Sequence, residues 1–272
     1  DTLEGGDDRD TFTNLGVGDA VDGSEGGDDY DTLDLRDWGK DRTNIIYDPA
    51  NSENGTVEFL DANGDVIGTM AFSNIENVIP CFTPGSRIAT ARGEVRVEDL
   101  CPGDMVLTRD NGYQPVRWVG GRRLSAAELA ATPNFWPVHI AQGALGESLP
   151  VRDMQVSPQH RMLITSARSE MFFGEREVLV AALHLVGQPG ITRVSPQEGV
   201  TYIHVLFDQH EVIQADGAWT ESFQPGDLTL AGMDDAQRNE LLALFPELQH
   251  GEGFASARRS LKAHETRVLL MA

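Results

Sequence analysis

From Cys81 onward the chain is a succession of short segments in which apolar and polar residues alternate, and this pattern constrains the fold more than any other feature. Four stretches carry it: SRIATARGEVRV, DMVLTRDNGYQPVRWVG, LPVRDMQVSPQHRMLITS and VTYIHVLFDQHEVIQADGAWTESF. Val, Ile, Thr and aromatic side chains favour strands, and a period of two turns one face of each strand toward a core. Asp-Asn-Gly, Ala-Asp-Gly and Cys-Pro-Gly-Asp supply turns between them. We therefore predict an all-β domain over residues 81–225.

Three separated stretches of this region set a cysteine and several histidines into the strand pattern: CFTPGSRI at 81–88, SPQH at 157–160 and YIHVLFDQHEVIQADG at 202–217. Together they resemble the Hint domain shared by hedgehog proteins and inteins, of the bacterial intein-like type. The first, continued by VEDLCPGDMVLTRDNG, is similar to the N-terminal splicing block of inteins. The second is similar to the Thr-x-x-His block, with Ser157 in the threonine position, and the third is similar to the penultimate strand pair.

The resemblance implies that the Cys81 thiolate attacks the carbonyl carbon of Pro80, which converts the Pro80–Cys81 peptide bond into a thioester and frees an amine. A thiol has an ordinary pKa of ~8.5, and an amide nitrogen leaves poorly. The reaction therefore needs a base for the thiol, an oxyanion donor for the carbonyl oxygen and a proton for the nitrogen. We expect His160 to donate that proton and Ser157 to hold the scissile amide.

The general base is expected from residues 202–210, read as one strand. Strict alternation sends Ile203, Val205 and Phe207 to one face and Tyr202, His204, Asp208 and His210 to the other. The polar face can line a site, and the sequence does not rank Asp208 against His210 as the base. The predicted catalytic set is Cys81, Ser157, His160, His204, Asp208 and His210.

The chain departs from inteins at the positions that release a C-terminal segment. Inteins end in His-Asn, whereas the corresponding residues here are Glu221 and Ser222. We therefore predict a one-sided reaction, in which the thioester is hydrolysed or transferred to an unknown external nucleophile, with the protein's own N-terminal segment as substrate.

Two other interpretations stay open. A thiol hydrolase acting in trans would also place a cysteine early and a histidine such as His210 downstream, although the flanking sequence lacks the helix signature of cysteine proteases. A Hint domain that no longer reacts would serve as a calcium-stabilised structural or adhesive module, and Pro80 favours this because it restricts the scissile amide. A disulfide from Cys81 to Cys101 would also block the nucleophile.

The first third of the chain is strongly acidic. Residues 1–80 hold 20 Asp and Glu against 4 Lys and Arg, a net of −16 out of −22 for the whole chain. Such a field repels nucleic acid and anionic membranes and attracts cations. No apolar run approaches the ~18 residues of a membrane helix, so no membrane span is expected.

The acidity lies in a repeat. GGDDRDTFT at 5–13 recurs as GGDDYDTLD at 26–34, which resembles the nonapeptide of RTX calcium proteins and implies a partial parallel β-roll over residues 1–37, the C-terminal part of a longer array. Phe12 and Leu33 are expected to point inward. Calcium would be bound by glycine carbonyls and Asp carboxylates. The candidate ligands are Gly5, Asp7, Asp10, Gly26, Asp28 and Asp31. The same resemblance implies an extracellular, secreted bacterial protein.

Two further segments complete the organisation. Residues 38–80 are interpreted as a β-hairpin linker, because NGTVEFLDANGDVIGTMAF alternates about an ANGD turn. Residues 226–272 are predicted to form a helical extension, with a helix after Asp234 or Asp235 that ends at Pro246.

Overall fold

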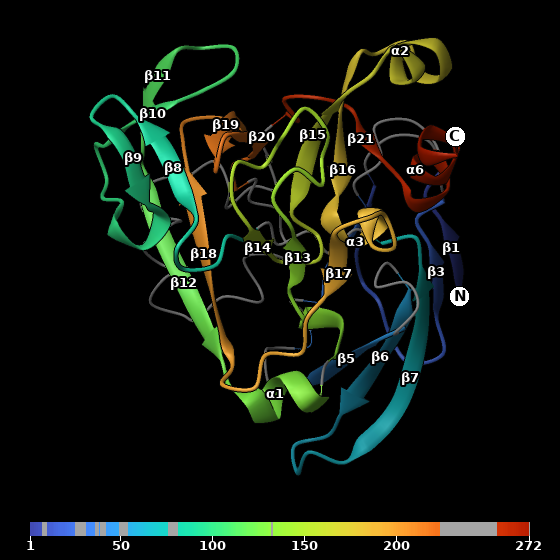
Figure 1. Cartoon of the computed structure of the whole chain (residues 1–272). Coiled ribbons are helices and arrows are strands. Elements are labelled where there is room, and N and C mark those ends of the chain that lie inside the picture. Colours follow the sequence, from blue (N-terminus) through green and yellow to red (C-terminus); the bar gives the residue numbers. More distant parts are fainter. Residues whose placement is uncertain are drawn as a thin grey trace. The chain divides into compact units, whose positions relative to one another are not determined.

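The computed structural model describes residues 1–6, 10–24, 31–35, 38, 42–48, 54–75, 81–131, 133–223 and 255–271. These residues form two compact units, one that ends at Ile75 and one that begins at Cys81. Figure 1 traces the elements of both, and each unit is described by itself below. Within the described ranges, no helix is long and apolar enough to cross a membrane.

The first unit is built on a five-stranded sheet of order β1-β3-β7-β6-β5. Its strands are β1 (Thr2–Glu4), β3 (Ala20–Asp22), β5 (Thr43–Tyr47), β6 (Gly55–Leu60) and β7 (Val66–Ser73). Strand β3 runs parallel to both β1 and β7, whereas β6 is antiparallel to β5 and β7. Alternate side chains of β6 and β7 are buried, which is why this sequence period forms a sheet with one face on a core.

The hairpin predicted around ANGD is present as β6 and β7. Asp61 closes its turn by accepting the backbone N–H groups of Asn63 at 2.8 Å and Asp65 at 3.0 Å, and Gly64 supplies the positive φ of 86°. Because β7 also pairs with β3, the hairpin shares a sheet with the N-terminal strands. The interpretation of residues 38–80 as a separate linker is corrected accordingly.

The repeated segments of the first unit lie in register with one another. Strand β2 (Thr11–Phe12) pairs in parallel with β4 (Thr32–Leu33), so that Phe12 is opposite Leu33. Both side chains are buried in the core of this unit, as expected from the repeat. Strands β1 and β3 form a second parallel pair with Thr2 opposite Ala20.

The second unit contains three sheets. The largest has the order β11-β10-β8-β19-β20-β15-β16-β21, with β9 paired to β8, and smaller sheets have the orders β12-β18 and β14-β13-β17. The strands are β8 (Arg87–Thr90), β9 (Gly93–Arg96), β10 (Met105–Leu107), β11 (Tyr113–Pro115), β12 (Trp118–Leu124), β13 (Val138–Ile140), β14 (Met154–Val156), β15 (Arg161–Thr165), β16 (Glu177–Ala181), β17 (Ile191–Arg193), β18 (Val200–Leu206), β19 (Val212–Ala215), β20 (Ala218–Glu221) and β21 (Ser260–Leu261). The β-domain predicted from the sequence is therefore present.

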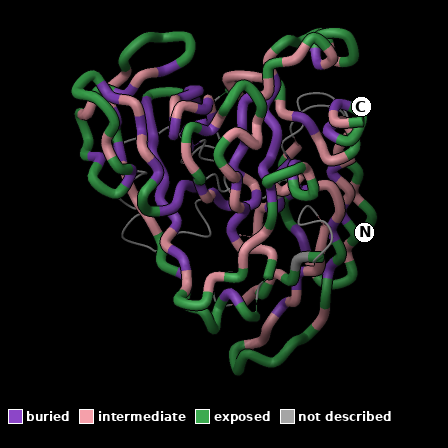
Figure 2. The backbone as a smooth tube through the Cα atoms, in the orientation of Figure 1, coloured by how far each residue is buried: buried purple, intermediate pink, exposed green. Residues whose placement is uncertain are grey.

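Short helices join the strands of the second unit: α1 (Ala126–Ala131), α2 (Ala167–Phe173) and α3 (Ala182–Leu185), with 3-10 turns at Val97–Asp99 and Pro133–Phe135. Helix α2 shows why such a segment is helical, since Ser166 accepts the N–H of Arg168 at its start and Gly174, with a positive φ of 76°, ends it. Figure 2 shows the buried chain concentrated along the central strands, where one apolar cluster is made by β8, β15, β16, β18 and β19.

The C-terminal segment packs into the second unit. Strand β21 extends the large sheet by pairing in parallel with β16, and helix α6 (Ala263–Leu270) follows it. Leu261 and Leu269 are buried in the same core as the central strands. The helix predicted after Asp235 lies outside the described residues, so α6 is the helix seen in the extension.

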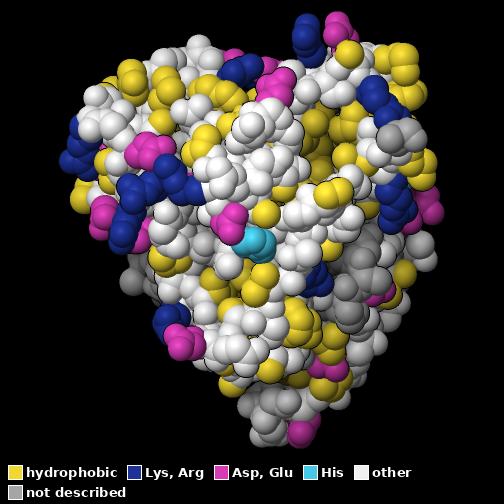
Figure 3. Space-filling model, in the orientation of Figure 1, with side chains coloured by type: hydrophobic (Ala, Val, Ile, Leu, Met, Phe, Trp, Pro, Cys, Tyr) yellow, Lys and Arg dark blue, Asp and Glu magenta, His cyan; other side chains and the backbone are white. Residues whose placement is uncertain are grey.

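The surface of the second unit carries charges of both signs. Exposed ion pairs join Arg92 to Asp104 and Arg152 to Glu94. Figure 3 shows basic and acidic side chains next to one another at several places on the face that it draws.

Candidate active site

Cys81 is held where two sheets of the second unit meet. The next residue, Phe82, exchanges two backbone hydrogen bonds of 2.9 Å with Ile203 of β18 and also forms a bridge with Val156 of β14. The carbonyl of Cys81 accepts the backbone N–H of Ser157 at 2.9 Å. The start of the predicted domain is thus fixed by β14, which directly precedes the second sequence motif, and by β18, which contains the start of the third.

The amide and the thiol of Cys81 each contact a predicted site residue. The backbone N–H donates to Ser157 Oγ at 3.0 Å, and Sγ lies 3.5 Å from His204 Nδ1 and 3.8 Å from its Nε2. Cys81 is only 2% exposed and packs among apolar side chains that include Leu129 and Tyr202. Water is therefore largely kept from the sulfur.

Burial raises the pKa of the Cys81 thiol far above its usual range, and the carboxylate of Glu221 adds to this, while the hydrogen bond with Ser157 acts in the opposite direction. The thiol is therefore neutral at pH 7, and a base must take its proton before it can attack a carbonyl. His204 is the base within reach. Its ring packs against Phe223, with the ring centroids 4.8 Å apart.

His160 reaches the same place from the turn 157–160. Its backbone N–H donates to the carbonyl of Ser157 at 3.1 Å, and its ring meets Phe82 edge-on with the centroids 4.5 Å apart. Burial lowers the pKa of His160 to about 4, although Glu221 works against this. The imidazole is therefore neutral at pH 7 and becomes an acid only after it has taken up a proton.

Comparison with known protein families identifies the domain. The family model of the Hint domain matches residues 80–227, just over half of the chain. The chain belongs to the Hint domain family. No match is found among curated proteins.

Solved structures similar to this chain carry the same kind of description. The bacterial intein-like domain from Clostridium thermocellum is 16% identical, with 53% of this chain and 99% of that chain covered and a TM-score of 0.37. A DnaB intein from Synechocystis sp. PCC 6803 is 13% identical, with 53% and 99% covered and a TM-score of 0.33. Membership of the Hint domain family is consistent with autoprocessing in general.

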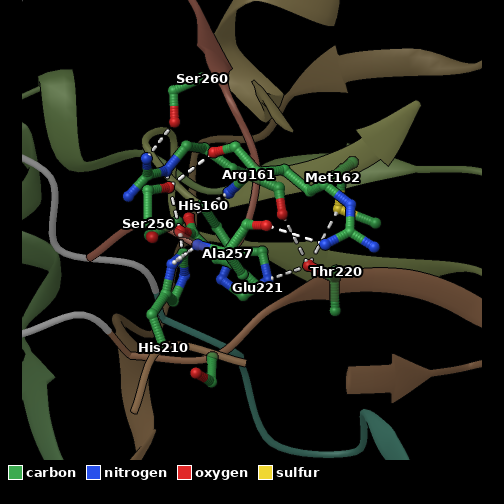
Figure 4. A network of polar contacts seen from close by, with 12 residues as sticks. His160, Arg161, Met162, His210, Thr220, Glu221, Ser256, Ala257 and Ser260 are labelled. Carbon is green, nitrogen blue, oxygen red and sulfur yellow. Dashed lines mark hydrogen bonds and ion pairs between the residues drawn. The ribbon is translucent and has the colours of Figure 1, made fainter. Parts of the chain in front are cut away.

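The Hint domain contains a second polar cluster next to His160, drawn in Figure 4. Glu221 is fully buried and pairs with Arg161 Nε at 2.8 Å and with His210 Nε2 at 3.2 Å. His210 Nδ1 accepts the backbone N–H of Ala257 at 3.1 Å. That nitrogen is therefore an acceptor, and the proton of a neutral His210 lies on Nε2, toward Glu221. His210 is thus engaged with Glu221 and the C-terminal segment, and Sγ of Cys81 lies beside His204 instead.

Asp208 lies elsewhere. Strand β18 ends at Leu206, so the alternation that placed Asp208 on the site face stops before it. Its side chain is 59% exposed and forms a two-pronged ion pair with Arg117 at 2.8 and 2.6 Å. An exposed carboxylate held by a guanidinium does not favour Asp208 as the base for the buried thiol, and its role as a base stays a prediction.

Sequence reasoning missed the residues that support His160. Thr220 lies 2.5 Å from His160 Nε2, and Arg161 and Glu221 form the buried pair beside it. A usable signal was present, since Glu221 is an acidic residue within an apolar strand pattern, and buried carboxylates are usually paired. The two cysteines are not joined: Cys81 is buried and Cys101 is exposed.

The other predicted residues are only partly described. Pro80, Asp7, Gly26 and Asp28 lie outside the described residues. Where the chain is described, no group of three or more His, Cys, Asp or Glu side chains is arranged to hold a metal ion. Asp31 Oδ1 accepts the N–H of Asp10 at 2.9 Å, and burial, together with the charges of Asp10 and Asp22, raises the pKa of Asp31 to about 7. Gly5 adjoins this pair, since a Cβ there would come within 2.7 Å of Asp10 Oδ2.

Proposed function

We propose that this chain is an autoprocessing Hint domain that cleaves on one side only. Cys81 attacks the carbonyl carbon of Pro80, so that a bond forms between Sγ and that carbon and the bond from the carbon to the Cys81 nitrogen breaks. The product is a thioester at Cys81 and a free amine at the same residue. The observation that carries the proposal is the double contact of Cys81, whose amide N–H meets Ser157 and whose thiol meets His204.

The roles follow from the contacts. His204 takes the thiol proton, Ser157 orients the scissile amide through its N–H, and His160 delivers a proton to the leaving nitrogen. The thiol loses one proton and the nitrogen gains one, so the shift is an isomerisation that consumes no external acid or base.

Release of the thioester then needs a nucleophile from outside the site. Glu221 and Ser222, which stand where inteins have His and Asn, are both fully buried. Each side chain accepts a backbone N–H, Glu221 from Arg161 and Ser222 from Glu211. Neither supplies the asparagine amide that cyclises in an intein, so the proposal ends with hydrolysis or transfer of the N-terminal segment.

The test is intact mass of the purified chain over time, with and without dithiothreitol or hydroxylamine. A fragment that begins at Cys81, that appears faster with the added nucleophile and that is absent from Cys81→Ala would support the proposal. Cys101→Ala is the matched control, because it removes the exposed thiol and should leave the reaction unchanged. An unchanged mass in every condition would contradict the proposal and favour the structural module. A rate that rises with protein concentration would favour a hydrolase acting in trans.

Calcium is the proposed cofactor of the first unit, and a secreted protein of the RTX type is the proposed context. Support comes from the carboxylates of Asp10, Asp22 and Asp31, which act on one another in a partly buried place where a divalent cation would offset their repulsion. The parallel pairing of the two repeats is also compatible with a β-roll. Isothermal titration with calcium, beside Asp10→Asn, tests this part without reference to cleavage.

A further inference from the structure

Thr220 makes a contact that the reaction scheme above leaves unused. It lies in β20, is fully buried, and its hydroxyl donates to the backbone carbonyl of Arg161 at 2.9 Å. The same oxygen lies 2.5 Å from His160 Nε2 and 3.5 Å from the sulfur of Met162. Figure 4 shows Thr220 among these partners.

These contacts decide where the proton of the neutral His160 ring lies. A hydroxyl carries one hydrogen, and a carbonyl oxygen can only accept, so the hydrogen of Thr220 is directed to Arg161. Thr220 Oγ1 must then accept from His160. The proton of the neutral imidazole is therefore on Nε2, and the lone pair is on Nδ1.

The lone pair on Nδ1 is the basic atom of the ring that remains open to a proton. His160 Nδ1 is buried and has no hydrogen-bond partner among the described residues. The ring packs on Phe82, the residue after the nucleophile, and its backbone is tied to Ser157, whose hydroxyl holds the Cys81 amide. A buried acceptor that makes no hydrogen bond lowers the stability of the fold. We therefore expect His160 Nδ1 to have a role in the reaction.

We propose that Thr220 is a positioning residue for the acyl shift at Cys81, because it holds His160 in the Nε2–H form and leaves Nδ1 to carry the proton of the scissile amide. This inference rests on the proposed function. One proton passes from the thiol to His204, and one proton passes from His160 Nδ1 to the nitrogen. The two rings return to neutrality by exchange with solvent, where His204 gives up one proton and His160 takes up one, so the number of protons is unchanged. The Nε2–H bond to Thr220 persists in both the neutral and the protonated ring, so the imidazole need not turn during the reaction.

The charges that face His160 come from three strands. Glu221 of β20 favours the protonated ring, whereas Arg161 of β15 and His204 of β18 oppose it. Since Glu221 and Thr220 are adjacent, β20 supplies both the acceptor for Nε2–H and the counter-charge for the imidazolium. Removal of the hydroxyl alone should therefore change the tautomer and the rate while the counter-charge stays.

The experiment compares Thr220→Val, which removes the hydroxyl with little change in volume, with Thr220→Ser, which keeps it. Thr266→Val is the matched control, since Thr266 is equally buried and its Oγ1 has no hydrogen-bond partner among the described residues. Two quantities are measured: the rate of hydroxylamine-dependent cleavage by intact mass, and the ¹⁵N chemical shifts of the His160 ring in the intact chain.

The wild type, Thr220→Ser and Thr266→Val should show the Nε2–H pattern and rates within about threefold of one another. Thr220→Val should lose that pattern and react roughly 10- to 100-fold more slowly, which is the rate equivalent of one charge-assisted hydrogen bond. A Thr220→Val chain that reacts at the wild-type rate overturns the inference, whichever tautomer it has. So does a wild-type ring with its proton on Nδ1. A wild type that never reacts refutes the proposed function itself, and the two failures are thereby distinguished.

Discussion

The second unit should lose stability in mild acid through His184, a residue outside the active site. His184 lies in α3 and is hydrogen-bonded to the backbone of Leu261 in the C-terminal segment. Burial, and to a lesser degree the charge of Arg267, lowers the pKa of His184 from 6.5 to about 4. The folded chain therefore keeps the ring neutral at a pH where the unfolded chain already binds a proton.

The pKa of His184 differs between the folded and the unfolded chain, and this difference sets the sign and size of the change in the free energy of unfolding with pH. A histidine with a depressed folded pKa contributes stability that is fully present above its unfolded pKa of 6.5 and is lost as the pH falls toward 4. Between pH 7 and pH 5 the loss is about 2 kcal/mol for one such group. His160, with its pKa also lowered to about 4, should add a similar amount. The free energy of unfolding should thus fall by about 4 kcal/mol over this range from the two residues.

The assay is urea unfolding at pH 7, 6 and 5, followed by tryptophan fluorescence in a Trp38→Phe background so that the signal comes from the second unit. The glutamine of His184→Gln keeps a donor for Leu261 but cannot titrate. Between pH 7 and pH 5 the free energy of unfolding of this variant should therefore fall by about 2 kcal/mol less than that of the parent. This corresponds to a difference of about 1 M in the urea midpoint at pH 5. His139→Gln, at a partly exposed ring, is the control. Parallel pH profiles for His184→Gln and the parent would refute the reasoning.

Three further outcomes are expected. Ser157→Ala should slow thioester formation at least about tenfold because the Cys81 N–H loses its acceptor, whereas Ser157→Thr should retain most of the rate. Equal rates for the two variants, measured by intact mass, would argue against orientation of the amide by Ser157. Glu221→Ala should destabilise the second unit by about 3–5 kcal/mol in urea, because Arg161 stays buried without its partner, while Asp208→Asn at the exposed pair should cost under about 1 kcal/mol and leave cleavage unchanged. Calcium at about 100 times its dissociation constant should stabilise the first unit by about 2.7 kcal/mol in thermal unfolding, and Asp31→Asn should reduce that gain.

The sequence predicted the parts of the site that short motifs encode. Residue types at fixed spacing placed Cys81, Ser157 and His160 in one predicted site. In the structure Ser157 contacts Cys81, and His160 is hydrogen-bonded to Ser157. His204 was found because it lies inside β18, where the alternation holds. Asp208 was misplaced because the chain leaves the strand after Leu206, and a two-residue pattern cannot reveal where a strand ends.

Contacts between distant segments were not predictable in this way. Leu179 lies opposite Ser260 in the parallel pair of β16 and β21, although 81 residues separate them, and a two-residue strand has no period to detect. Thr220 and Arg161 are also brought together by strand pairing, through the register of β15 with β20, which the sequence of neither strand specifies. The hairpin within 38–80 was predicted correctly as a hairpin, but its place in the sheet depends on the pairing of β7 with β3, which local patterning does not specify.

Under the proposed function, the absence of intein-like C-terminal release and the support of His160 have one structural origin in β20. An intein must let go of the segment that follows its last strand. Here Glu221 ties β20 to Arg161 and His210, His210 accepts the N–H of Ala257, and β21 adds that segment to the large sheet. Each of these contacts holds the C-terminal flank. Under the proposed function, Glu221 and Ser222 therefore anchor the chain at the positions where an intein has His-Asn and releases it. The anchored chain could still rearrange at Cys81, because the residues proposed to act on the N-terminal bond, Ser157, His160 and His204, lie on other elements.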